Sequence, residues 1–235
     1  MLDTKFWKKY FSVYDILNHV GPYRSLLEEI VGAANPKHGD NVLDMGVGTG
    51  NLALLLQAKG ATVLGIDFSD EALQVYKMKN PSAQVYLHDL MNDLHFLKDE
   101  SFDIVVSNNV LYNLPRPRRK ELMKDVKRVL KPGGQVVLAN IHKGFKPVKI
   151  YLEAIKENIK KFGFLNTFGL IAKLFVPTLK IFYYNSYIKR AYKFDIDSLF
   201  DFDEQKEILQ DAGFREISPT KLVYAGQGII NTALK

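Results

Sequence analysis

Between residues 41 and 140 the chain alternates short apolar segments with helical ones, and this alternation restricts its fold more than any other feature. The apolar segments are rich in valine, leucine and isoleucine, which is typical of buried strands. The five predicted strands are 41–45, 62–66, 84–88, 102–107 and 135–140. Helices between successive strands predict an α/β fold with a mostly parallel sheet and helices on both faces.

The segments outside this alternating region also have readable patterns. The chain is predicted to be helical near its start, with a break at Gly21-Pro22. The motif Lys131-Pro-Gly-Gly134 should end the preceding helix, because proline cannot continue it. The further predicted elements are a helical region over 1–35, helices over 118–130 and 203–213, and an antiparallel hairpin formed by 214–224 and 228–234.

The composition excludes several kinds of chemistry. The 235 residues are 47% hydrophobic and 25% charged, as in ordinary globular proteins, and include no cysteine. Disulfides, thiolate zinc sites, iron–sulfur clusters and cysteine nucleophiles are therefore excluded. The first ten residues lack the apolar core of a signal peptide, and charged residues interrupt every stretch long enough to span a bilayer. These features predict a cytoplasmic enzyme or binding domain.

The net positive charge is concentrated in residues 143–193. This segment has 11 Lys and Arg against two Glu, a net charge of +9, whereas the rest of the chain sums to −3. It is also rich in phenylalanine and tyrosine, a combination that favours a partner or substrate surface. Apolar residues at 148, 152, 155, 159 and 162 form a helical stripe. We expect a helical lid over a hydrophobic substrate pocket, with peripheral membrane contact as the alternative.

A glycine-rich loop follows the first predicted strand. It reads Asp44-Met-Gly46-Val-Gly48-Thr-Gly50, and glycines at such a turn let a ligand approach the backbone closely. Dinucleotide-binding loops have a glycine where this chain has Asn51. The spacing therefore disfavours NAD, and Asp44 before the loop favours a ligand that carries an amino acid.

Two further acids follow the second and third predicted strands. Asp67 can accept hydrogen bonds from both hydroxyls of a ribose, as acids at this position do in related nucleotide folds. Asp89 can accept from an adenine amino group, with the backbone N–H of Leu90 beside it. Because open α/β sheets bind ligands beyond the carboxyl ends of their strands, Asn108 should lie in the same crevice.

Several residues are candidates for catalysis or for covering the ligand. His142 follows the fifth strand and is the best-placed proton acceptor, and Tyr112 lies in the loop after the fourth strand. The segment Asn109-Val-Leu-Tyr112 has the spacing of the motif in amino-directed nucleic-acid methyltransferases but lacks its prolines, which disfavours base methylation. Tyr14 is a candidate to cover the ligand from the N-terminal region. Asn108 and Asn140 replace the acids that a metal-dependent catechol-type enzyme needs, so no metal is expected.

Together these motifs resemble the class I S-adenosylmethionine-dependent methyltransferases, especially the small-molecule group that includes ubiquinone and menaquinone enzymes. The resemblance covers roughly residues 38–141 and 203–235. Its motifs are Leu43-Asp-Met-Gly-Val-Gly-Thr-Gly50, Gly65-Ile-Asp-Phe-Ser69, Phe102-Asp-Ile-Val-Val106, Leu130-Lys-Pro-Gly-Gly134 and Ala212-Gly-Phe214. It implies a Rossmann-like sheet of order 3-2-1-4-5-7-6, with strand 7 antiparallel and a helical insert after strand 5.

The resemblance also implies site roles. It places Gly46 and Gly48 at the methionine moiety of the cofactor, Asp67 at the ribose and Asp89 at the adenine. The complete set of expected cofactor-binding residues is Asp44, Gly46, Gly48, Gly50, Asp67, Phe68, Asp89, Leu90, Asn108 and Tyr14. The expected domains are an N-terminal cap over 1–37, a cofactor-binding core over 38–142 and 201–235, and an insert over 143–200.

The expected activity is transfer of the methyl group of S-adenosylmethionine to an O, N or C atom of a small hydrophobic or aromatic molecule. The product cofactor would be S-adenosylhomocysteine. Three alternatives remain open: a methyltransferase acting on RNA or protein through the basic insert, a cofactor-binding protein without activity, and an NAD-dependent oxidoreductase. The acceptor and the oligomeric state are not predicted.

Overall fold

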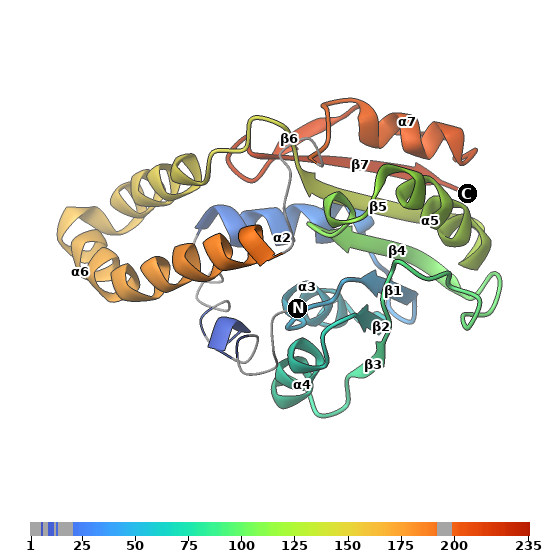
Figure 1. Ribbon diagram of the computed structural model, residues 1–235, viewed down its shortest axis with the longest axis horizontal. Coiled ribbons are helices and arrows are strands. Elements are labelled where there is room, and N and C mark those ends of the chain that lie inside the picture. Colours follow the sequence, from blue (N-terminus) through green and yellow to red (C-terminus); the bar gives the residue numbers. More distant parts are fainter. Residues whose placement is uncertain (1–5, 7–8, 12, 14–20, 192–198) are drawn as a thin grey trace.

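A single mixed sheet organises the computed structural model, which describes residues 6, 9–11, 13, 21–191 and 199–235 (Figure 1). The sheet has seven strands in the order β3-β2-β1-β4-β5-β7-β6. The strands are β1 (Asn41–Met45), β2 (Thr62–Asp67), β3 (Gln84–Leu87), β4 (Phe102–Asn108), β5 (Leu130–Ile141), β6 (Lys221–Val223) and β7 (Gly228–Leu234). Strands β1 to β5 pair in parallel, and β7 runs antiparallel to both β5 and β6. The fold predicted from the sequence is confirmed.

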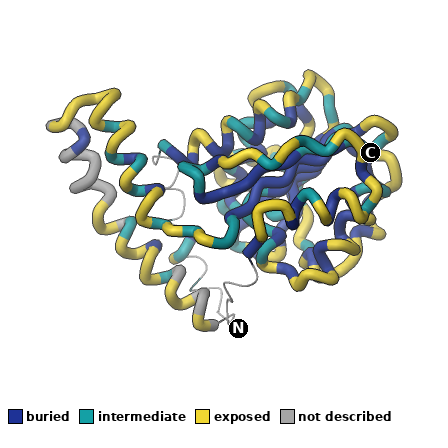
Figure 2. The backbone as a smooth tube through the Cα atoms, turned by 90° about the horizontal axis from the view of Figure 1, so that it is seen from above, coloured by how far each residue is buried: buried dark blue, intermediate teal, exposed yellow. Residues whose placement is uncertain are grey.

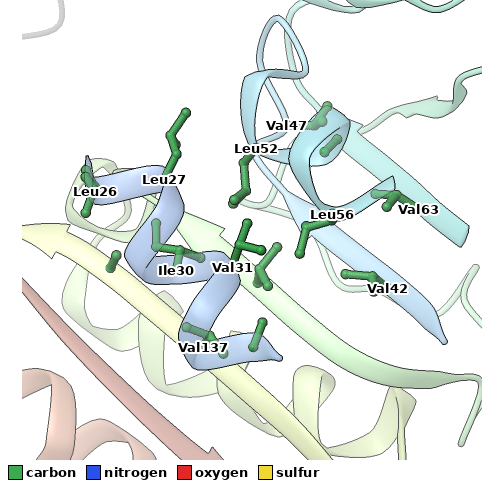
Figure 3. Packing of buried hydrophobic residues seen from close by; sticks show 14 of the residues in the cluster. Leu26, Leu27, Ile30, Val31, Val42, Val47, Leu52, Leu56, Val63 and Val137 are labelled. Atoms are coloured by element: carbon green, nitrogen blue, oxygen red, sulfur yellow. The ribbon is translucent and has the colours of Figure 1, made fainter. Parts of the chain in front are cut away.

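Helices cover both faces of the sheet. They are α2 (Gly21–Ala34), α3 (Asn51–Gln57), α4 (Asp70–Lys79), α5 (Arg116–Val129), α6 (Pro147–Ala191) and α7 (Glu204–Asp211). Side chains of α2, α3 and α4 share a buried cluster with one face of the strands, and those of α5 and α7 share a second cluster with the other face. Figure 3 shows the first cluster, where Leu27 and Val31 of α2 lie near Leu52 and Leu56 of α3. Burial on both faces explains why the inner strands are almost continuously apolar.

Local signals in the sequence explain several element boundaries. The Ser69 hydroxyl caps α4 by accepting a hydrogen bond from the Ala72 N–H at 3.3 Å, as the sequence predicts. Gly213 ends α7 with a φ of 77°, which a residue with a side chain rarely adopts. One predicted strand is too long, because only Lys221–Val223 of the segment 214–224 pairs as a strand. The residues before it contact β7 through an isolated bridge between Arg215 and Leu234 and through the Ser218 N–H, which donates to the Thr232 carbonyl at 2.9 Å.

Helix α6 forms a hairpin that extends away from the sheet (Figures 1 and 2). Its two legs meet at Gly163, whose φ of 78° is not helical. The first leg is fastened through Ile150 and Ala154, which belong to the same buried cluster as α2. Among the described helices, none combines the length and the apolar character that crossing a bilayer requires.

The sequence predicts that the apolar stripe of the first leg faces inward, but in the structure this stripe faces outward. The expected lid would bury this stripe, but Val148, Leu152 and Phe162 are 61%, 53% and 52% exposed. The reason is geometric: Ile150 and Ala154, four residues apart, are the residues that contact the core, and they lie on another face of the helix. Periodicity identifies an apolar face but not the surface against which it packs.

Candidate functional site

The candidate site lies where the order of the strands reverses, between β1 and β4. Ligands bind open α/β sheets beyond the carboxyl ends of the strands at such a point. A cavity of about 340 Å³, its open mouth included, occupies this position. Its lining residues are Tyr23, Asp44, Gly46, Val47, Gly48, Thr49, Asn51, Leu52 and Asn108. The structure thus brings together four predicted residues, Asp44, Gly46, Gly48 and Asn108.

The glycine loop turns tightly between β1 and α3. The N–H groups of Gly46 and Val47 both donate to the Ile66 carbonyl of β2, at 2.8 and 3.0 Å. Gly50 has a φ of 80° and lies directly against the ring of Tyr76, so a Cβ there would overlap the ring. Gly50 is therefore needed for packing of the loop, and it does not line the cavity.

Gly48 differs from Gly50 because the space beside it is open. Its φ is 54°, and a Cβ built on it would have no neighbour within 4 Å. Its N–H donates to Asp67 Oδ2 at 2.9 Å, which ties the loop to the end of β2. The backbone of Gly48 is thus not covered by a side chain where it faces the cavity, so a ligand can approach it closely.

Asp44 is the most unusual polar group in the cavity. It is 2% exposed, and its Oδ2 atom has no hydrogen-bond partner among the described residues. Burial raises the pKa of Asp44 to about 8, and the nearby charge of Asp67 adds to the effect. A buried carboxyl without a partner is costly, and a cationic ligand would satisfy it while favouring its ionised form. The site therefore suits a ligand with an ammonium group.

Asp67 is buried beside the same loop. Its two carboxylate oxygens accept from the N–H groups of Gly48 and Ser69, each at 2.9 Å. Burial raises the pKa of Asp67, and these backbone hydrogen bonds oppose that increase. Each carboxylate oxygen can accept a second hydrogen bond. The geometry is compatible with the predicted contact to ribose hydroxyls, although Asp67 does not line the cavity.

Asn108 at the end of β4 supplies a second unsatisfied buried atom. Its Oδ1 has no hydrogen-bond partner in the described part of the chain, and the residue lines the cavity. The next residue, Asn109, has a φ of 57° and uses its Oδ1 to accept from the Ile141 N–H at 3.0 Å. Asn109 thereby fixes the end of β4 to β5, and Asn108 is directed to the crevice.

A buried amide network supports the loop after β4. Asn140 Oδ1 accepts from the Leu111 N–H at 3.1 Å, and Asn140 Nδ2 donates to Gln205 Oε1 at 2.8 Å. Gln205 Nε2 donates to the Leu138 carbonyl and to Asn231 Oδ1, both at 2.9 Å. These contacts link four segments of the chain, namely the loop after β4, β5, α7 and β7, and no sequence pattern indicates them. The sequence suggests Asn140 only as a replacement for a metal-binding acid.

The predicted adenine-side residues lie outside the cavity. Asp89 is exposed, and its Oδ1 accepts from the Met91 N–H at 2.9 Å in a tight turn after β3. Leu90 is buried in the core, and its carbonyl accepts from Arg118 Nε. Phe68, next to Asp67, is 59% exposed. The assignment of these residues to the adenosine moiety stays a prediction.

The two catalytic candidates have contacts that limit what they can do. His142 is half-buried, and its Nε2 lies 3.1 Å from the Gly226 carbonyl. A carbonyl only accepts, so Nε2 carries the hydrogen and Nδ1 is the nitrogen left to take up a proton. Tyr112 packs against the buried cluster under α5, and burial raises its pKa, which keeps the phenol protonated and so unavailable as a base. Tyr14 lies outside the described residues.

The cavity also contains residues that the sequence motifs do not assign to the ligand. Thr49 and Asn51 belong to the glycine loop and the first turn of α3, and the Lys79 ammonium donates to both, at 2.9 Å each. Tyr23 comes from α2, and no local motif indicates that this helix would reach the crevice. Within the described chain, no three His, Asp or Glu side chains gather as a metal site would require.

Comparison with known proteins agrees with the geometry of the crevice. Residues 43–138 match the family described as a methyltransferase domain, and this stretch contains the glycine loop, Asp67 and Asn108. The chain carries a class I methyltransferase domain. An uncharacterized methyltransferase of Synechocystis is 37% identical over 105 residues, which are 45% of this chain and 49% of that protein. A demethylmenaquinone methyltransferase of Clavibacter sepedonicus is 32% identical over 136 residues, or 55% and 54% of the two chains.

The similarity to known proteins supports the cofactor class and the fold of this methyltransferase domain. The chain spans about half the length of the curated relatives it matches. A solved S-adenosylmethionine-dependent methyltransferase from Aquifex aeolicus superposes with a TM-score of 0.63, covering 100% of this chain and 99% of that one. Its sequence identity is 18%, so it supports the fold of the domain and not its acceptor. The class to which this domain belongs uses S-adenosylmethionine.

Proposed function

We propose that the protein is an S-adenosylmethionine-dependent methyltransferase acting on a small hydrophobic or aromatic molecule. The observation that carries the proposal is the pair of unsatisfied buried oxygens, Asp44 Oδ2 and Asn108 Oδ1, whose residues line the same cavity as the uncovered backbone of Gly48. An amino-acid moiety has the ammonium group that these oxygens require. A dinucleotide phosphate would instead bring negative charge against Asp44, which disfavours the oxidoreductase alternative.

The methionine end of the cofactor would be held by Asp44 and the glycine loop, and its ribose by Asp67. S-adenosylmethionine supplies a methyl group that its sulfonium already activates, so the protein needs no nucleophile of its own. The residues of the crevice bind the cofactor, orient the acceptor and exclude water. Asp44 changes its protonation on binding, because an adjacent ammonium favours the carboxylate and releases the proton that Asp44 holds near neutral pH.

His142 is the proposed proton acceptor where the acceptor molecule must lose a proton. Its hydrogen bond to the Gly226 carbonyl fixes the ring and leaves Nδ1 as the basic atom. Asn109 and Asn140 hold the neighbouring ends of β4 and β5 together. His142 is thus attached to a rigid part of the sheet, as a group that positions a proton must be.

A quinone-like or lipid-like acceptor is the finer part of the proposal. The matched relative from Clavibacter sepedonicus is named a demethylmenaquinone methyltransferase, and the hairpin α6 that follows β5 is rich in aromatic and aliphatic side chains. An apolar acceptor agrees with both observations. An RNA acceptor would interact with the positive charge of this insert, but it would leave the apolar residues of the insert without a role.

The test traces the methyl group. The protein is incubated with S-adenosylmethionine that carries an isotope in its methyl group, together with a lipid and quinone extract, with RNA or with a protein lysate. We expect label in the organic phase only, and much less of it with Asp67→Ala; Asp211→Ala, at an exposed acid on α7, should behave as wild type. Label in RNA or protein would contradict the small-molecule proposal, and cofactor binding without any transfer would indicate a non-catalytic protein.

A further inference from the structure

The outer surface of the hairpin α6 exposes more apolar side chains than folding requires. On the first leg Val148, Leu152, Ile159 and Phe162 are exposed by 39% to 61% of their surface. They recur every three to seven residues, which places them on one face of the helix. Ile150 and Ala154 show that another face attaches the leg to the core. The exposed face therefore has no role in holding the hairpin to the domain.

The second leg repeats this arrangement. It packs on the first leg through the rings of Tyr151 and Phe182, whose centroids are 5.4 Å apart. Its exposed apolar residues also share one helix face: Phe175 58%, Val176 56%, Leu179 52%, Tyr183 60% and Tyr187 47%. Phe164, next to the turn between the legs, is 70% exposed. Figure 2 shows exposed residues on both legs of the hairpin, where the structure describes them. Large apolar side chains exposed in this number on both legs mark an interaction site.

Positive charge accompanies the apolar face. Lys149, Lys156 and Lys160 are exposed, and their spacing of seven and four residues places them in one row beside the stripe of the first leg. The two acids of the insert, Glu153 and Glu157, lie on the far side of this lysine row from the stripe. The segment 143–193 has a net charge of +9. The surface therefore requires a partner that is both apolar and negatively charged.

We propose that the outer face of the hairpin α6 binds the surface of a bilayer that contains anionic lipids. The aliphatic and aromatic side chains enter the boundary between headgroups and acyl chains, and the lysine row contacts the headgroups. A second copy of the chain is disfavoured, because two surfaces of the same charge repel each other. RNA is disfavoured, because contacts with its phosphates and bases would leave the side chains of Leu152, Ile159 and Leu179 exposed to water.

The proposal is tested by flotation of the whole protein with lipid vesicles. We expect binding to vesicles of phosphatidylcholine mixed with phosphatidylglycerol, weaker binding to phosphatidylcholine alone, and loss of binding at high salt. Leu152→Ser combined with Phe162→Ser should weaken binding at least about tenfold, because two exposed side chains no longer enter the bilayer. Met78→Ser, at a 74% exposed residue of α4, is the matched control and should bind as wild type.

The lysine row is tested in the same way. Replacing Lys149, Lys156 and Lys160 by Gln should weaken binding by about fivefold per lysine. Replacing the exposed Lys59, Lys77 and Lys98 by Gln changes the net charge equally and should have little effect. Circular dichroism verifies that each variant is folded.

Five results would overturn the proposal. Wild-type protein that does not float with anionic vesicles, or a Leu152→Ser/Phe162→Ser variant that floats as well as wild type, excludes a membrane-binding face. Equal losses in the two lysine triples mean that net charge alone acts. A concentration-dependent dimer that the Leu152→Ser/Phe162→Ser variant abolishes assigns the face to a second copy. RNA binding that depends on the lysine row but not on Leu152 assigns it to nucleic acid. None of these measurements depends on methyl transfer.

Discussion

Replacing Asp44 by Asn should stabilise the ligand-free protein, and the gain should increase with pH. Burial raises the pKa of Asp44 to about 8 in the folded state, far above the value of an unfolded chain. Between these two pKa values the folded state binds a proton that the unfolded state has lost, so stability decreases as pH rises. The slope is about 1.4 kcal/mol per pH unit, so between about pH 5 and pH 7 the variant should gain about 3 kcal/mol relative to wild type.

The assay is urea unfolding of the cofactor-free wild type and of Asp44→Asn at several pH values. The difference in the free energy of unfolding should grow up to about pH 8 and then level off, because Asp44 is ionised in both states above that pH. Glu216→Gln, at an exposed acid outside the crevice, is the control and should show no comparable growth. A difference between Asp44→Asn and wild type that does not change with pH would refute the reasoning.

The glycine loop and the amide network lead to two further predictions. Gly50→Ala should lower the free energy of unfolding by roughly 2 to 4 kcal/mol, because the new Cβ overlaps the Tyr76 ring at positive φ, whereas Gly48→Ala, with open space beside it, should cost about 1 kcal/mol. Equal losses in urea unfolding would contradict this distinction. Gln205→Leu should cost about 2 to 4 kcal/mol, because it leaves buried amide partners unsatisfied, while Gln210→Leu on the exposed side of α7 should be nearly neutral. A stable Gln205→Leu protein would show that the network does not matter.

The part of the fold that the sequence predicts well is the part with local signals. The strands β1 to β4 are short runs whose positions are set by composition and period, whereas β5 begins at Leu130, five residues before its predicted start at 135. Ser69 and Gly213 act within one turn of the helices they begin and end, so their effect is visible in a few consecutive residues. The glycine loop is equally local, and it correctly locates the crevice at the end of β1.

The parts that the sequence could not predict depend on distant contacts. Gln205 bonds to Asn140 and Asn231, which are 65 and 26 residues away in the chain, and no periodic pattern links them. The stripe of the first leg of α6 has a helical period, but the choice between packing inward and facing outward depends on Ile150 and Ala154 fitting α2. The unsatisfied state of Asp44 likewise results from burial by neighbours that come together only in three dimensions.

The central claim, that the crevice holds S-adenosylmethionine through Asp44 and Asp67, is tested most directly by calorimetric titration. Wild-type protein is titrated with S-adenosylmethionine, S-adenosylhomocysteine and NAD, beside Asp67→Ala and the control Asp211→Ala. We expect both adenosyl compounds to bind wild type and the control, NAD not to bind, and Asp67→Ala to bind at least about tenfold more weakly. Binding of NAD, or adenosyl binding that Asp67→Ala leaves unchanged, would contradict the account.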